Sequence, residues 1–138
     1  MGILFITMYV VFVGLATLFL KFSLDKHLEN YKLLMFSGIS MFIVGLVATL
    51  IANRGLSITK ADLSAGLIYG GLHAIGALGF FIAASKMDIG IATALAMVYV
   101  VVAAVGSWLF LDESMNSAKV IGIVLILAGA AVLALQRG

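Results

Sequence analysis

The sequence predicts an all-α membrane protein with five transmembrane helices, and three observations lead to this prediction. Five apolar stretches fill the 138-residue chain, each near the ~20 residues that a helix needs to cross the hydrocarbon core of a bilayer. Hydrophobic residues make up 64% of the chain and charged residues only 10%, where a soluble domain averages roughly 25% charged. The mean hydropathy is +1.28. We therefore expect residues 1–138 to form a single transmembrane domain.

The five predicted spans are separated by four short polar connections. Their approximate bounds are 2–22, 33–53, 63–85, 89–111 and 118–135. Connections this short make consecutive helices antiparallel neighbours. Five crossings place the two ends on opposite sides of the membrane, so a second copy inserted upside down would form an inverted pair, as in many transporters.

Residues at the ends of the spans are typical of helix boundaries. Asn53-Arg54-Gly55 predicts the stop of the second helix. Thr59, followed by Asp62 three residues later, predicts a hydroxyl cap with an answering acid at the start of the third. Asp88 and Ser117 are predicted to cap the fourth and fifth helices. Periodicity leaves a re-entrant third segment open, because that span is the most glycine-rich.

Composition excludes several functions. The chain has no cysteine, so it has no disulfide and no thiolate metal site. The net charge of +2 is small and the bases lie at span ends, which does not make a nucleic-acid surface. His27 and His73 fall on different segments without an acid on the same helix face. We therefore predict no enzymatic activity, no metal, no cofactor and no nucleic-acid partner.

His73 is the ionisable residue of note inside a span. An ionisable group within the bilayer is costly and suggests function, and imidazole can exchange protons near neutral pH. Tyr69 lies one turn away on the same face. Two interpretations stay open: a polar stripe facing a cavity, or a neutral histidine hydrogen-bonded to a neighbouring helix.

The other candidates are amphipathic side chains in the first and fourth spans. Aromatic rings with one polar tip suit a small organic or zwitterionic ligand, although a membrane tyrosine is often an interface anchor. The predicted substrate-binding residues are His73, Tyr69, Tyr9, Thr7, Tyr99 and Thr93.

Several motifs in order resemble one known family. They are Gly14 with Lys21, the passage from Phe80 to Ala94, the run Ser107-Trp108-Leu109-Phe110-Leu111-Asp112-Glu113, and Gly122 with Gly129. Across nearly the whole chain they resemble the EamA-type half of the drug/metabolite transporter superfamily, in which the run after the fourth helix ends in Gly-Glu. Such a half has five helices, and most members join two halves as an inverted pair.

Two departures from that family matter for function. Family members usually carry a proline early in the fourth helix, where this chain has Val100. Any kink at this place must therefore have another origin, or be absent. The related small multidrug resistance proteins carry a glutamate in their first helix, but the first span here has no acid, so their proton-drug exchange chemistry is not carried over.

The resemblance implies a transporter of small organic metabolites, amino-acid-like or drug-like, in the cell (inner) membrane. It would work by alternating access as a dimer, with a cavity built by the first, third and fourth helices of each copy. The alternatives are a lipid-linked flippase subunit, for which Lys21, Lys26 and Lys32 would contact head groups, and an accessory membrane protein without transport.

The distribution of Lys and Arg sets the expected orientation only weakly. One side would hold Arg54, Lys60 and Lys119, and the other Lys21, Lys26, Lys32, Lys86 and Arg137. A count of three basic residues on one side against five on the other favours a cytoplasmic C-terminus. A bias this small also permits insertion in both orientations. The expected partners are membrane lipid, a small-molecule substrate and a second copy of the chain, with an antiparallel homodimer as the boldest prediction.

Overall fold

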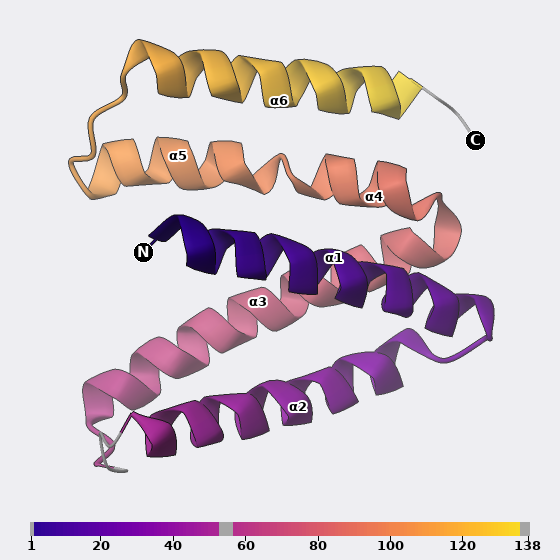
Figure 1. The fold of residues 1–138 in the computed structure, drawn as a ribbon, viewed down its shortest axis with the longest axis vertical. Coiled ribbons are helices and arrows are strands. Elements are labelled where there is room, and N and C mark those ends of the chain that lie inside the picture. Colours follow the sequence, from indigo (N-terminus) through magenta and orange to yellow (C-terminus); the bar gives the residue numbers. More distant parts are fainter. Residues whose placement is uncertain (1, 53–56, 136–138) are drawn as a thin grey trace. The chain divides into compact units, whose positions relative to one another are not determined.

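The computed structural model describes residues 2–52 and 57–135, and every regular element in them is an α-helix (Figure 1). The helices are α1 Gly2–Asp25, α2 Asn30–Ile51, α3 Lys60–Lys86, α4 Ile89–Ala96, α5 Tyr99–Phe110 and α6 Ser117–Leu135. Taking α4 and α5 as one span, five segments are long and apolar enough to cross a membrane. The predicted fold class is confirmed.

The third span is one continuous helix. At ~1.5 Å per residue its 27 residues extend about 40 Å, which is more than enough to cross the hydrocarbon core. Its glycines do not interrupt it, which argues against a re-entrant third segment.

The predicted caps of α3 and α4 are confirmed. The Asp62 backbone N–H donates to Thr59 Oγ1 at 3.1 Å, and the Thr59 backbone N–H donates to Asp62 Oδ2 at 3.0 Å. Asp88 Oδ1 accepts from the backbone N–H groups of Gly90 at 2.8 Å and Ile91 at 3.3 Å. Each cap satisfies donors that have no partner within the first helical turn.

The predicted cap of the last helix was wrong by one residue. Ser117 is the first residue of α6, and the capping side chain is that of Asn116, whose Oδ1 accepts from the Lys119 N–H at 2.9 Å. Both residue types cap well, so the sequence did not separate them. The predicted stop at residues 53–55 lies outside the described residues; α2 ends at Ile51.

Two helix C-termini close with a non-glycine residue at positive φ. At the end of α1, His27 has φ 61°, and the Leu28 N–H donates to the Ser23 carbonyl at 3.3 Å. After α5, Asp112 has φ 53°, and the Glu113 N–H donates to the Ser107 carbonyl at 3.3 Å. The first is a Schellman motif, in which glycine is the usual residue at the left-handed position; the second has the left-handed residue but a bond that spans six residues instead of five.

The helices belong to two compact units. One contains α1 up to Leu18 together with α4, α5 and α6, and in it α4 packs against α6. The other contains the rest of α1 with α2 and α3, where Lys21 Nζ donates to the Ala84 carbonyl at 3.2 Å and pairs with Asp25 at 3.3 Å.

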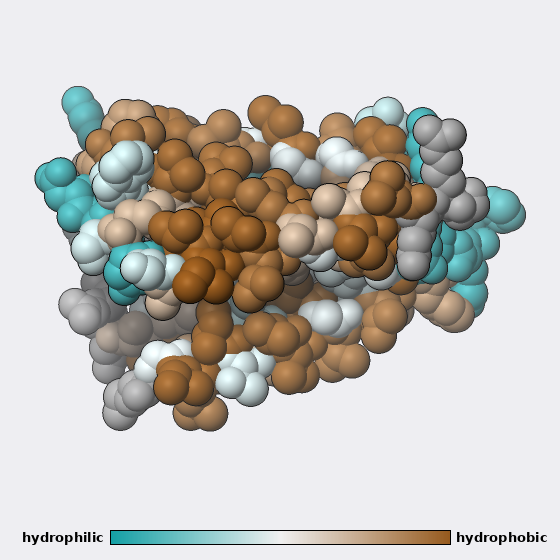
Figure 2. Space-filling model, turned by 90° about the horizontal axis from the view of Figure 1, so that it is seen from above, coloured by the Kyte–Doolittle hydropathy of each residue, from teal (hydrophilic) through white to brown (hydrophobic). Residues whose placement is uncertain are grey.

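Large apolar side chains are mostly exposed in both units. Among the described residues, the buried apolar residues are few and three of them are small: Leu20, Leu24, Ala84, Ala92 and Ala130. Figure 2 shows hydrophobic side chains over most of the face in view. Such a surface suits lipid or a partner helix, because lipid tails are as apolar as the side chains that they meet.

Candidate functional site

The fourth span is broken near its middle. α4 ends at Ala96 and α5 begins at Tyr99, with a turn at Met97 and Val98 (Figure 1). The Val98 N–H donates to the Leu95 carbonyl at 3.2 Å. The N–H groups of Val100 and Val101 donate three residues back as well, at 3.0 and 2.9 Å. Bonds to the third preceding residue thus replace the α-helical bonds to the fourth.

Valines cluster at this break, which has no proline, although a similar cluster at Val10, Val11 and Val13 leaves α1 unbroken. Val98 is followed after Tyr99 by Val100, Val101 and Val102. Side chains branched at Cβ crowd the preceding helical turn and lower helix propensity. The break lies next to Val100, where a kink of another origin than proline was left open by the sequence.

The break interrupts the regular α-helical bonding of the span. The Val98 N–H bonds to the Leu95 carbonyl and the Val100 N–H to the Met97 carbonyl, so the backbone is locally irregular. Irregular backbone at membrane depth is tolerated only inside protein or beside a water-filled cavity. This part of the span is therefore unsuited to contact with lipid.

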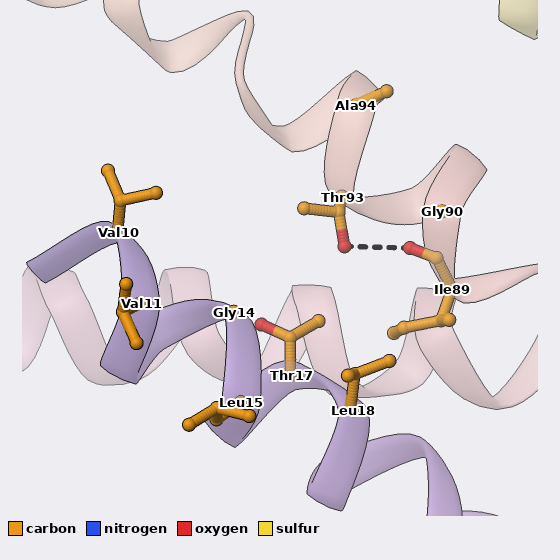
Figure 3. A pocket seen from close by; sticks show the side chains of 10 residues that line it. All are labelled: Val10, Val11, Gly14, Leu15, Thr17, Leu18, Ile89, Gly90, Thr93 and Ala94. Atoms are coloured by element: carbon orange, nitrogen blue, oxygen red, sulfur yellow. Dashed lines mark hydrogen bonds between the residues drawn. The ribbon is translucent and has the colours of Figure 1, made fainter. Parts of the chain in front are cut away.

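A groove lies beside α4 within the same unit, against the first part of α1 (Figure 3). Its volume is about 620 Å³, within the ~300–1,000 Å³ of small-molecule sites. The lining residues are Val10, Val11, Gly14, Leu15, Thr17, Leu18, Ile89, Gly90, Thr93 and Ala94.

The polar groups of the groove are acceptors. Thr93 Oγ1 donates to the Ile89 carbonyl at 2.7 Å, the dashed contact of Figure 3, and Thr17 Oγ1 donates to the Val13 carbonyl at 2.8 Å. Both hydroxyl protons are thus engaged within their own helices, while the oxygen lone pairs remain. The lining residues carry no charged side chain.

Three of the six predicted site residues lie in this unit close to the break or groove. Thr93 lines the groove. Tyr99 begins α5 directly after the break, and the side chain of Tyr9 of α1 lies near that of Tyr99. Thr7 belongs to the same unit but is exposed and donates to the Ile3 carbonyl at 2.9 Å, outside the groove.

The remaining two predicted residues form a pair in the other unit. Tyr69 and His73 stack on α3 with ring centroids 6.0 Å apart and planes 10° from parallel. Both are exposed, and over the described ranges neither ring has a hydrogen bond or ion pair. The predicted shared face of the two side chains is present.

The sequence analysis missed the groove wall formed by α1. Gly14 and Thr17 stand one turn apart, and Val10 precedes Gly14 by four residues, so the three share a helix face. The sequence signal that could have predicted this wall was Gly14 next to the hydroxyl of Thr17 on one helix face. No group of three His, Cys, Asp or Glu side chains able to hold a metal occurs in the part of the chain that the structure describes.

A model of the EamA-like transporter family matches residues 1–135. The chain belongs to this family. No curated protein and no solved structure matches it. As a member of this family, the chain is a membrane transporter of the drug/metabolite type. Its five apolar spans agree with this. Transporters of this family are not enzymes, in line with the prediction.

At two positions this chain departs from the usual residue of the EamA-like family. Asp112 stands where the family run has glycine, and its φ of 53° shows why glycine suits that place. Val100 stands at the family's proline position, directly after a break that forms here without proline.

Proposed function

We propose that this chain moves small organic metabolites, amino-acid-like or drug-like, across the cell (inner) membrane by alternating access as a dimer of five-helix units. The observation that carries the proposal is His73. It is the midpoint of Lys60–Lys86, it is exposed, and its ring stacks on that of Tyr69. Ionisable residues at this depth face a bundle interior or a water-filled cavity, because lipid contact is costly.

A second copy would supply the missing cover for the α3 face that carries His73 and Tyr69. Alternating access in transporters built from repeats uses two related units around a midplane site. The near balance of Lys and Arg, three against five, supports an antiparallel pair.

The lipid-flippase alternative would depend on three lysines that have partners within the chain. Lys21 contacts Ala84 and Asp25, Lys32 pairs with Glu29 at 3.0 Å, and Lys26 lies 4.1 Å from the centre of the Phe22 ring. Lysines engaged in this way are poorly placed to gather a head group. We therefore do not propose that function.

Transport in proteoliposomes tests the proposal. A panel of radiolabelled amino acids and small amines is offered to liposomes with and without the purified chain. We expect uptake of at least one compound above empty liposomes, and a loss of roughly tenfold or more in His73→Asn, since the variant removes the imidazole and changes the ring stack. His27→Asn, outside the spans, is the matched control and should keep full uptake.

Unchanged uptake in His73→Asn would show that His73 is a packing residue, and no uptake of any compound would contradict the transporter itself. Reporter fusions at the C-terminus test the antiparallel pair. Alkaline phosphatase and a fluorescent protein should both be active, and activity of the cytoplasmic reporter alone would rule out dual topology.

A further inference from the structure

We propose that the Tyr69–His73 stack binds a planar aromatic ring of the substrate, on the face of His73 that Gly76 and Ala77 leave uncovered. The inference rests on the proposed function, because it takes the α3 face with His73 as the site, and it names the class of compound that is carried. All four residues belong to α3, within the unit Phe19–Ser85.

The two rings of the stack are parallel and too close together to admit a third ring. Their planes lie 10° apart and their centroids 6.0 Å apart. A ring inserted between them would need about 7 Å, which is two contacts of ~3.5 Å between carbon atoms. A flat ligand must therefore use an outer face of the stack.

The outer face of His73 is open. It lies toward the C-terminal end of α3, because Tyr69 precedes His73 by one turn and covers the other face. Helical side chains lean toward the N-terminus, so the residues three and four positions later, Gly76 and Ala77, are the ones that would cover it. Gly76 has no side chain, and beyond the local backbone no heavy atom lies within 4 Å of where its Cβ would stand.

This part of α3 selects for ring shape rather than for charge. Residues 63–85 include no Lys, Arg, Asp or Glu, so the helix offers no carboxylate, ammonium or guanidinium to a substrate. An uncovered aromatic face attracts another flat ring beyond the gain from apolar area alone. The site therefore distinguishes a flat ring from a saturated ring of the same size.

Pairs of compounds that differ only in ring saturation test this distinction. The pairs are phenethylammonium with cyclohexylethylammonium, L-phenylalanine with L-cyclohexylalanine, and 3-phenylpropionate with 3-cyclohexylpropionate. The apolar area is similar within each pair, so burial alone does not favour the aromatic member. Calorimetry on the full chain in lipid nanodiscs, with empty nanodiscs subtracted, measures the affinities. We expect the aromatic member of at least one pair to bind roughly threefold to tenfold more tightly, the range for one aromatic contact.

Two substitutions of His73 separate the flat ring from the imidazole. His73→Phe keeps a flat ring and should keep the preference for the aromatic member. His73→Leu removes the plane and should make the two members of the pair bind equally. A preference that survives in His73→Leu, or that is lost in His73→Phe, would overturn the role of the ring face.

Covering the open face should also abolish the preference. Gly76→Leu places a side chain over His73 without changing either ring. Gly71→Leu is the matched control, since residue 71 lies nearly opposite His73 around the helix and also has nothing within 4 Å of its Cβ position. It should keep the preference, and circular dichroism shows that both variants stay helical. Equal loss in the two variants would overturn the assignment to this face.

The outcomes for the ring site and the transporter are separable. Equal binding of both members in every pair, or no binding of any probe, would overturn the ring site, and uptake in proteoliposomes would then leave the transporter standing. An aromatic preference in binding without uptake of any compound would refute the transporter and leave a binding site.

Discussion

α3 contains more glycine than the fourth span, yet α3 is continuous and the fourth span is broken. α3 is unbroken over 27 residues although it contains five glycines, whereas the fourth span breaks after eight residues of α4 with neither glycine nor proline at the break. Glycine weakens helices in water partly by exposing backbone to solvent, and lipid offers the backbone no competing partner. Crowding by branched side chains persists in any solvent. In this chain glycine content therefore does not decide where a span breaks.

Proline at matched positions gives the largest expected effect. Gly76→Pro removes a helical hydrogen bond and clashes with the preceding turn of α3, so the free energy of unfolding should fall by about 3 kcal/mol. Val100→Pro removes one bond, from its N–H to Met97, in a stretch that is already irregular. Its cost should be at most about 1 kcal/mol. Thermal unfolding in detergent, followed by circular dichroism, measures both.

Gly76→Ala is the control for the α3 position and should not destabilise, because open space surrounds Gly76. If Val100→Pro lowered the free energy of unfolding as much as Gly76→Pro, the fourth span would be as regular at this position as α3.

Removal of helix caps gives the next effect. Asp88→Ala should lower the free energy of unfolding by about 1–2 kcal/mol, since its carboxylate accepts from two backbone N–H groups at the start of the short α4. Thr59→Ala should cost about 0.5 kcal/mol, because the 27-residue α3 can lose its first turn and keep the rest. Denaturant titration of the two variants compares them. Equal losses would mean that helix length does not matter.

Glycine-to-alanine exchange should have opposite signs in the two spans. A Cβ at Gly90 would stand 3.0 Å from Asp88 Oδ1, so Gly90→Ala should destabilise by about 0.5–1 kcal/mol by displacing the cap. Gly71→Ala meets nothing within 4 Å and should stabilise by a similar amount, about 0.5–1 kcal/mol, through helix propensity. A stabilising Gly90→Ala would show that the cap adjusts freely.

The smallest effect is expected where the fourth span ends. Asp112→Gly should stabilise by about 0.5 kcal/mol, because glycine adopts the φ of 53° without the strain of a side chain. Asp112→Ala keeps the strain and is the control. Equal melting temperatures of the two variants would show that backbone strain at residue 112 does not affect stability.

The features predicted from the sequence were local ones. Five spans follow from apolar length, and the caps at Thr59 and Asp88 depend on residues within one turn. The pairing of Tyr69 with His73 follows from a spacing of four. The identity of the cap at Asn116 was missed because two adjacent residues can both serve.

The features not predicted depend on several residues together or on distant segments. The break at Met97 and Val98 has no single breaker residue, and average hydropathy is the same for a straight or a broken span. The groove joins Gly14 to Thr93, far apart in the chain. Tyr9 and Tyr99 were named separately, but their proximity needed the fold.

The self-contained caps have a consequence for biosynthesis. Thr59 with Asp62, Asp88 with Gly90, and Asn116 with Lys119 each lie within four residues of one another. The starts of α3, α4 and α6 can therefore satisfy their first amide groups as soon as each segment leaves the ribosome, before any neighbouring helix exists. Insertion can proceed one span at a time, and docking of the helices becomes a separate, later step within the bilayer.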